Sequence, residues 1–200
     1  MPSKTELRKA NTPASMQPIP FWGNIFARKL ILLALTVFLF TSCDDDRQLS
    51  KMLITSPSFG DGEIIPDRHT CRIEQISPAL YFHNAPKDTV QFAVIVDDYD
   101  SPEGLTTHWL LWNIDGASPH IPQDIKIGFE SGGYYQGMAD DGNAGYFAPC
   151  PPSGETHRYH FRVFALKADL GVLPGASRFD VLPAVEKQAI AYGELVGIVD

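Results

Sequence analysis

Residues 148–166, APCPPSGETHRYHFRVFAL, join a proline-rich turn directly to an alternating strand. Three prolines fix φ and withhold backbone donors, and Gly154 lets the chain turn before the strand pattern begins at His157. Because side chains alternate between the two faces of a strand, His157 and Tyr159 head an otherwise apolar row. The stretch predicts polar groups at the rim of a buried sheet face, although a plain turn whose histidine pairs with a neighbour fits it too.

Two earlier segments are also typical of strands. Residues 90–96, VQFAVIV, are nearly apolar on both faces, which indicates an interior strand. Residues 108–114, HWLLWNI, follow an acidic, proline-containing loop and have the composition of a second strand. Alternation predicts that one face of this second strand carries His108, Leu110, Trp112 and Ile114.

The ends of these strands predict a site. If the two segments form an antiparallel hairpin, Asp98 leaves the first strand where His108 enters the second. A third strand that starts at His157 and runs parallel to the second reaches the same end of the sheet. We therefore expect Asp98, His108 and His157 to converge, roofed by the proline pair 151–152 and by part of the glycine-rich stretch 115–147.

Such a set suits a phosphoryl or carboxylate anion. Two imidazoles can donate hydrogen bonds and can gain charge near a pKa of ~6.5, while Asp98 can orient one of them. A metal site is an alternative, although the sequence has no HExxH motif and no zinc-type cysteine pair. A hydrolase that uses His157 with Asp98 or Cys150 is another, although no GxSxG motif marks a nucleophile.

The N-terminus has the layout of a bacterial export signal. A basic segment ending in Arg28 and Lys29 precedes an apolar run of eleven positions, residues 30–40, which is too short to span a bilayer. Residues 40–43, FTSC, resemble a lipobox, whose cysteine becomes the lipid-bearing first residue of the mature protein. We interpret residues 1–43 as a signal and lipoprotein leader with Cys43 as the lipidation site.

Three readings of this leader stay open: a lipoprotein, a cleaved soluble product and an uncleaved anchor. Translation from Met16 instead of Met1 would give a signal of more ordinary length. The polar residues 44–57 are interpreted as a tether, and residues 58–200 as the functional domain. This division predicts a protein of the cell envelope, facing the periplasm or the exterior.

The net charge of the mature protein indicates which kinds of molecule it can bind. After Cys43 the chain has 11 basic and 23 acidic residues, a net charge of −12. This excess of acid disfavours non-specific binding to nucleic acid, so an anion must enter a local site. The remaining cysteines, Cys71 and Cys150, either form a disulfide or stay as two buried thiols.

The C-terminal region predicts one helix. Asp180 suits a helix N-cap, and residues 181–192 carry apolar side chains at helical spacing up to Gly193. Residues 195–199 could add a last strand. We expect the helix to cover the sheet.

Several motifs resemble those of the phosphatidylethanolamine-binding protein family, in the branch called Raf kinase inhibitor-like. The similarity spans about Ser58 to Val199. The matching elements are Asp98-Tyr99-Asp100-Ser101-Pro102 (DPDxP), His108-Trp109-Leu110-Leu111-Trp112-Asn113 (HWxxxN), Gly145-Tyr146, Pro151-Pro152-Ser153-Gly154 (PPxG), His157-Arg158-Tyr159 and Ile76-Ser77-Pro78.

The resemblance implies a mainly β fold, in which a large antiparallel sheet packs on a smaller sheet, with a C-terminal helix. It implies a pocket for phosphate-bearing headgroups and related anions, without established catalysis and without a cofactor. Phe147 and Ala148 stand where the family has a glycine pair, which alters the pocket rim. The implied ligand-binding residues are Asp98, His108, His157 and Tyr159, with Pro102, Pro151 and Pro152 shaping the wall.

We therefore predict a non-enzymatic, envelope-anchored domain that binds a small phosphorylated or carboxylated ligand. The membrane contact would come from the lipid anchor, and no nucleic acid, metal or cofactor is expected. A hydrolase and a protein-interaction or inhibitor module are the alternatives. The sequence identifies neither a protein partner, nor the ligand, nor the oligomeric state.

Overall fold

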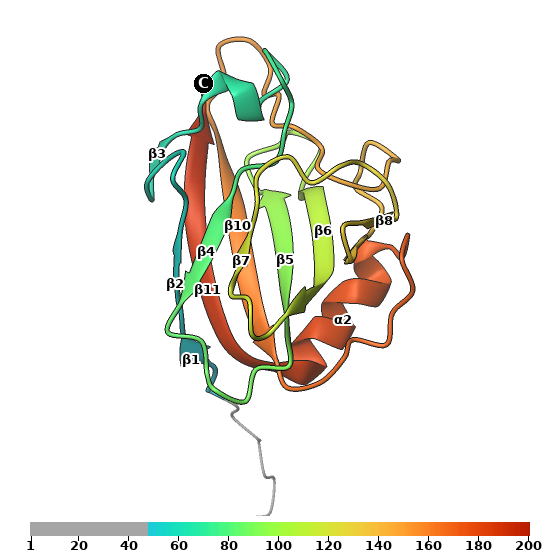
Figure 1. Cartoon of the computed structure of the whole chain (residues 1–200). Coiled ribbons are helices and arrows are strands. Elements are labelled where there is room, and N and C mark those ends of the chain that lie inside the picture. Colours follow the sequence, from blue (N-terminus) through green and yellow to red (C-terminus); the bar gives the residue numbers. More distant parts are fainter. Residues whose placement is uncertain (1–47) are drawn as a thin grey trace, which may run out of the picture. The chain divides into compact units, whose positions relative to one another are not determined.

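A computed structural model describes residues 48–200 (Figure 1). The predicted leader 1–43, both candidate start sites, the lipidation site Cys43 and residues 44–47 of the predicted tether lie outside the described residues. Arg47–Asp200 form one compact unit that contains its own hydrophobic core, so we expect this part to fold without the leader.

Two sheets make up the domain (Figure 1). In spatial order, the large sheet contains β1 (Ser50–Lys51), β11 (Ala189–Val199), β10 (His157–Leu166), β5 (Gln91–Asp98), β6 (Thr106–Asp115), β9 (Tyr134–Gln136) and β8 (Glu130–Ser131), and β3 (Glu63–Ile64) pairs with β11. The small sheet contains β2 (Leu53–Thr55), β4 (Leu80–His83) and β7 (His120–Ile121). The described residues also form the 3₁₀ helix η1 (Asp67–His69) and the helix α2 (Arg178–Gln188).

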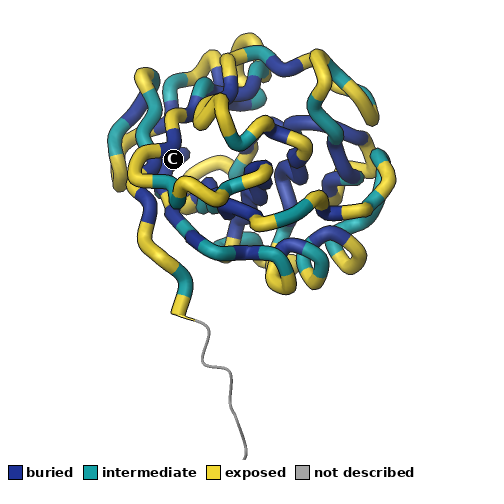
Figure 2. The backbone as a smooth tube through the Cα atoms, turned by 60° about the horizontal axis from the view of Figure 1, so that its bottom comes forward, coloured by how far each residue is buried: buried dark blue, intermediate teal, exposed yellow. Residues whose placement is uncertain are grey.

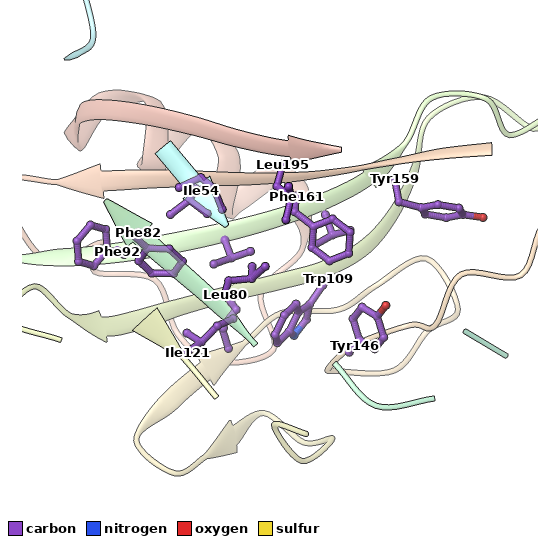
Figure 3. Close-up of a cluster of buried hydrophobic side chains, with 14 of the residues drawn as sticks. Ile54, Leu80, Phe82, Phe92, Trp109, Ile121, Tyr146, Tyr159, Phe161 and Leu195 are labelled. Atoms are coloured by element: carbon purple, nitrogen blue, oxygen red, sulfur yellow. The ribbon is translucent and has the colours of Figure 1, made fainter. Parts of the chain in front are cut away.

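The core has two layers, one on each face of the large sheet. Between the two sheets, Phe92, Trp109 and Phe161 pack against Leu80 and Phe82 of the small sheet (Figure 3). On the opposite face, a second cluster lies between the large sheet and α2. Its members include Ala93, Ile95, Leu110, Trp112, Phe164, Val181 and Val185. The predicted architecture of a large antiparallel sheet, a smaller sheet and a C-terminal helix is confirmed.

The large sheet is centred on β5, which is buried along its whole length. This strand pairs antiparallel with both β6 and β10, as the apolar run 90–96 predicts for an interior strand. Consequently β6 and β10 run in the same direction, and the ends at which they begin lie beside the end at which β5 finishes. Buried segments gather inside the domain and the connecting loops are more exposed (Figure 2).

The predicted tether 44–57 is wrong for residues 50–55, which form β1 and β2. Met52 and Ile54 are buried, with exposed fractions of 4% and 2%, because they alternate with polar or exposed neighbours and face the core. β1 has two residues and β2 has three, so their alternation is too short to be recognised in the sequence.

The boundary between the C-terminal helix and the last strand also differs from the prediction. The helix α2 begins after Ser177, not at Asp180, and ends at Gln188. From Ala189 the chain is a strand paired with all of β10, so residues 189–192 are not helical. A Cβ at Gly193 would lie 2.8 Å from atoms of β2 and its neighbour, so this glycine permits close approach of two strands and does not end the helix.

None of the helices among the described residues is both long enough and apolar enough to cross a bilayer.

Candidate functional site

Three strands bring the predicted site residues together at one end of the large sheet. Asp98 is the last residue of β5 and is the register partner of Tyr159 on β10. His157 is the first residue of β10, and His108 lies near the start of β6. We call Asp98, His108, His157 and Tyr159 the polar cluster; each is buried, with exposed fractions of 1–3%.

A β-bulge turns His108 toward the polar cluster. The pairing of β5 with β6 joins Val96 to Trp109 but Asp97 to Thr107, so His108 is an extra residue between two paired positions. His108 and Trp109 consequently face the same side of the sheet, where the His108 ring meets Tyr159 edge-on at 5.0 Å.

The predicted face for His108, shared with Leu110 and Trp112, is therefore wrong. Those two residues pack toward α2, on the other side of the large sheet from Tyr159. The convergence of Asp98, His108 and His157 was nevertheless predicted, because the order of strand ends does not depend on the bulge.

His157 is held between two carboxylates. Its Nδ1 lies 2.7 Å from Asp98 Oδ2, and its Nε2 lies 3.3 Å from Glu155 Oε2. Burial opposes protonation of this imidazole, but the hydrogen bonds to Asp98 and Glu155 outweigh it and raise the pKa of His157. The protonated ring donates to both carboxylates, so His157 favours the imidazolium form.

Asp98 also anchors the loop that follows β5. Its Oδ1 accepts a hydrogen bond from the Asp100 backbone N–H at 2.8 Å, while Oδ2 faces His157. With both oxygens used, the carboxylate has a fixed orientation. It is therefore a rigid partner for the His157 ring.

His108 has the opposite electrostatic character. Burial lowers the pKa of His108, although its backbone hydrogen bond and nearby carboxylates act in the other direction. Nδ1 lies 2.8 Å from the carbonyl oxygen of Phe147 and donates to it, and the two rings stack at 4.6 Å. The neutral ring thus keeps its proton on Nδ1, which leaves Nε2 with a lone pair that can accept a hydrogen bond.

Tyr159 supplies a neutral phenol next to the carboxylate. Burial is the largest cause that raises the pKa of Tyr159, and the negative charge of Asp98 adds to it. Figure 3 shows its hydroxyl directed away from the labelled core side chains. The phenol therefore belongs to the polar end of the sheet.

Two loops flank the polar cluster, and one ion pair ties the first of them to β10. Arg158 donates to both carboxylate oxygens of Asp100, at 2.7 and 2.9 Å. The hydrogen bond from this guanidinium is the main reason why the pKa of Asp100 falls to about 2. Arg158 is therefore a structural ion-pair partner that fixes this loop against β10.

The predicted wall prolines lie in these same loops. Pro102 is exposed in the loop between β5 and β6, and Pro152 is exposed in the loop that precedes β10. Pro151, between Cys150 and Pro152, is half-buried. All three prolines lie in loops next to strand ends of the polar cluster, and their role as its wall stays a prediction.

A disulfide joins Cys71 to Cys150, with a Cα–Cα distance of 5.4 Å. The sequence alone allows either this disulfide or two buried free thiols, and the structure shows the disulfide. Beside the bond, the Cys71 N–H donates to the Pro149 carbonyl at 3.0 Å, and Tyr146 Oη donates to the His69 carbonyl at 2.9 Å. The segment that carries η1 is thereby joined to residues 146–150.

A cleft of about 260 Å³ lies at the other end of β6. Its lining includes Asp115, His120 and Tyr134. Ile114, which lines the cleft, is six residues from His108 along β6, or about 20 Å. The cleft is therefore distinct from the polar cluster. Among residues 48–200, no group of three or more histidine, cysteine, aspartate or glutamate side chains is arranged to hold a metal ion.

Sequence reasoning missed two residues that contact the histidines. Glu155 lies in the proline-rich turn, where a lone exposed carboxylate gives no signal of its own. Phe147 was noted only as a departure from a glycine pair, yet its ring covers one face of His108. An aromatic residue next to the proline-rich turn was the one sequence feature that could have indicated this contact.

The fold and the polar cluster define a β-sandwich protein with a buried carboxylate–imidazole pair at the end of its large sheet. The sequence model of the family described as phosphatidylethanolamine-binding protein matches residues 55–200. The chain therefore belongs to the phosphatidylethanolamine-binding protein family.

Individual relatives agree with this assignment. A UPF0098 protein of Archaeoglobus fulgidus is 37% identical over 181 residues, which cover 86% of this chain and 62% of that protein. The crystal structure of Escherichia coli YbcL, described as a member of the mammalian PEBP family, superposes with a TM-score of 0.69 and 30% identity, covering 74% of this chain and 98% of that one. LppC of Mycobacterium tuberculosis, whose name includes the word lipoprotein, is 33% identical over 147 residues, covering 73% and 71% of the two chains.

Proposed function

We propose that this domain is a non-enzymatic binding module that takes a small phosphate- or carboxylate-bearing ligand at the polar cluster. The observation that carries the proposal is the buried His157, hydrogen-bonded to Asp98 at 2.7 Å, with a raised pKa. A buried imidazolium is a charge-assisted donor, and solvent screens its attraction to an anion less than it would at an exposed site. The family assignment supports the same ligand class, which includes phospholipid headgroups.

The two histidines suit different parts of one ligand. His157 offers a positive donor for an anionic oxygen, while His108 offers a lone pair on Nε2 for an N–H or O–H group. A molecule with a phosphate or carboxylate next to an ammonium or hydroxyl group satisfies both. Phosphoethanolamine has this combination, and it is the probe that we choose.

Catalysis has little support from the described contacts. Cys150 is bonded to Cys71 and is therefore not a free nucleophile. The raised pKa of His157 favours its protonated form, and an imidazolium cannot accept the proton of a hydroxyl or thiol in the way that a nucleophilic mechanism needs. These contacts favour binding over the hydrolase alternative.

Anchoring at Cys43 is part of the proposal. The support is the lipobox-like segment before Cys43 and the similarity to LppC. A lipid on Cys43 would place the domain at the surface of an envelope membrane.

Binding of phosphate-type ligands should weaken as pH rises. Because the pKa of His157 is raised, its positive charge is present at about pH 5.5 and is lost as pH rises through that pKa, above ~6.5. We expect calorimetry on the domain without residues 1–43 to show binding of phosphate and phosphoethanolamine that is about tenfold or more weaker at pH 8 than at pH 5.5. Sulfate, which keeps its charge over this range, separates the titration of the protein from that of the ligand.

The variant His157→Ala should lose both the affinity and this pH dependence. His160→Ala is the matched control, because His160 lies on the same strand and pairs with Glu194, at 3.0 Å, on the opposite face. Equal binding by His157→Ala and the unmodified domain would reject the proposal. A reproducible protein partner together with no binding of either anion would favour the interaction-module alternative.

Glu155→Gln should strengthen anion binding. Glu155 Oε2 occupies the Nε2 side of His157 at 3.3 Å, where a ligand oxygen would compete with it, and its side chain is 52% exposed. Removal of this charge should raise the affinity for phosphate by up to about fivefold, the scale of an exposed ion pair. The pH at which binding is half lost should fall, since Glu155 helps to raise the pKa of His157.

Glu194→Gln provides the control for this variant. Glu194 pairs with His160 in a similar carboxylate–imidazole contact, away from the polar cluster. It should leave both the affinity and the pH profile unchanged. An unchanged or lower phosphate affinity in Glu155→Gln, measured by the same calorimetry, would contradict competition between Glu155 and the ligand.

A further inference from the structure

We infer that the polar cluster faces away from the bilayer that carries the lipid anchor, and therefore takes a water-soluble phosphate-bearing molecule and not a headgroup of that bilayer. The inference rests on the proposed function, both in its anchoring at Cys43 and in its ligand class. The step beyond the proposed function is the origin of the ligand, which comes from solution and not from the bilayer.

The described chain enters the domain at the end of the large sheet opposite the polar cluster. β1 pairs in parallel with the beginning of β11, through Ser50 and Ala191. The far end of β11 carries Val199, the partner of His157. In Figure 1, β1 accordingly lies at the lower end of the domain and the C-terminus at the upper end.

The parallel pairing also fixes the direction of the chain. The described residues that precede Ser50 are Gln48 and Leu49, which continue from β1 away from the end that holds His157, and Leu49 packs against the core between the sheet and α2. The chain that leads to Cys43 therefore joins the described domain at the end farthest from the polar cluster.

The distance along the sheet exceeds the reach of the segment. Ala191 pairs with Ser50 on one side and with Ala165 of β10 on the other, so Ala165 marks the level of Ser50 along the sheet. His157 and Ala165 are eight residues apart on β10, which corresponds to about 26 Å. Cys43 and Leu49 are six residues apart, so a fully extended chain between them spans at most about 22 Å. If the end that holds His157 rested on the bilayer, Leu49 would stand farther from the membrane than the chain from Cys43 can reach.

The polar groups also lie at the end of the sandwich and not on its side. His108 and His157 lie at the beginnings of their strands, Asp98 lies at the end of its own, and the Tyr159 hydroxyl is directed away from the core (Figure 3). A domain that lay sideways on the bilayer would present a sheet face or edge to it, with the polar cluster directed along the surface.

Charge at the two ends fits this orientation. Four of the five lysines among residues 48–200 lie at the β1 end, and all four are exposed. They are Lys51, Lys87, Lys167 and Lys187, and the acidic residues of the same end are Asp88, Asp115, Asp169 and Glu186. Among the described residues that end is thus close to neutral, whereas the mature chain has a net charge of −12, so anionic headgroups repel it less than the rest of the domain.

The test compares two kinds of vesicle that carry the lipidated full-length protein in its processed form on their outer surface. One kind is made of phosphatidylcholine alone, and the other contains equal parts of phosphatidylcholine and phosphatidylethanolamine. The affinity for soluble phosphoethanolamine is measured on both. We expect the two dissociation constants to agree within about twofold, because the headgroups of the bilayer cannot reach the site.

A second protein carries twenty Gly/Ser residues inserted between Asp46 and Arg47. Its longer tether lets the domain turn over, so phosphatidylethanolamine in the bilayer should now weaken the binding of soluble phosphoethanolamine by about tenfold, through its high local concentration. Competition only with the long tether supports the inference. Competition with the native tether overturns it, as does the absence of competition with either tether, since the site would then reject the headgroup for another reason.

Two further controls separate this inference from the function on which it rests. The unanchored domain without residues 1–43 must bind soluble phosphoethanolamine; if it does not, the proposed ligand class is wrong, and the inference with it. Cys43→Ser must abolish flotation of the protein with the vesicles; if the variant floats as well as the lipidated protein, the proposed anchoring is wrong and the reach of the tether no longer applies.

Discussion

Asp97→Ala is expected to lower the stability of the domain by about 3 to 5 kcal/mol, the typical cost of removing one partner of a buried ion pair. Asp97 has an exposed fraction of 0% and lies beside Asp98, but on the opposite face of β5. Its two oxygens receive Arg162 of β10 and Arg178, the first residue of α2, the latter at 2.6 Å. Without the carboxylate, two guanidinium groups with exposed fractions of 15% and 18% would lose their counter-charge.

Denaturant unfolding of the domain without residues 1–43 measures this effect, and the melting temperature should fall on the order of 10 °C. Asp88→Ala is the control, since Asp88 is an exposed loop residue whose removal should change stability by less than about 0.5 kcal/mol. Asp97→Ala combined with Arg162→Met and Arg178→Met should recover part of the loss, because the stranded charges disappear. A loss below about 1 kcal/mol in Asp97→Ala would show that solvent already screens the network.

The location of the candidate site could be predicted from sequence because it depends on robust features. A long apolar strand, a hairpin and a third strand of known direction determine which strand ends meet, and Asp98, His108 and His157 all lie at such ends. A shift of one residue within a strand leaves this adjacency intact. The role of these residues in binding stays a prediction.

The orientation of individual side chains could not be predicted in the same way. The bulge at His108, opposite Val96 and Asp97, inverts the face on which His108 lies, and it exists only because two particular strands pair with that register. A second shift between Phe92 and Val94 returns Ile114 to the face opposite Trp112. Alternation read from one strand carries no information about such an insertion.

The end of the C-terminal helix shows how tertiary pairing overrides a local pattern. Leu182, Val185 and Ala189 fit one helical face, yet α2 ends at Gln188. Residues 189–199 also alternate between buried and less buried positions, and they gain a complete ladder of hydrogen bonds with β10. For residues 189–192, pairing with β10 as a strand stabilises the chain more than a longer helix would. Because this pairing is a tertiary contact, local helix propensities do not reveal it.

Removal of the disulfide is expected to cost about 4 kcal/mol, because Cys71 and Cys150 are 79 residues apart and the bond restricts a long loop in the unfolded chain. The variant with both Cys71→Ser and Cys150→Ser should unfold at a correspondingly lower denaturant concentration. Cys150 is exposed, so a reductant can reach the bond and the unmodified domain can also be compared before and after reduction. This comparison measures the effect of the disulfide even if the double variant does not fold. A reductant should reproduce the loss in the unmodified domain and change nothing in the double variant.

Ligand affinity separates the two roles that this bond could have. The Cys71 N–H and the Tyr146 hydroxyl still join the two segments after reduction, through the carbonyls of Pro149 and His69. The carbonyl of Phe147 therefore keeps its position against His108, and the dissociation constant for phosphoethanolamine should change by less than about threefold while the domain remains folded. A large loss of affinity without a loss of stability would instead mean that the disulfide holds the wall of the site in place. The expected result, lower stability with nearly constant affinity, follows because the cross-link acts mainly on the unfolded chain.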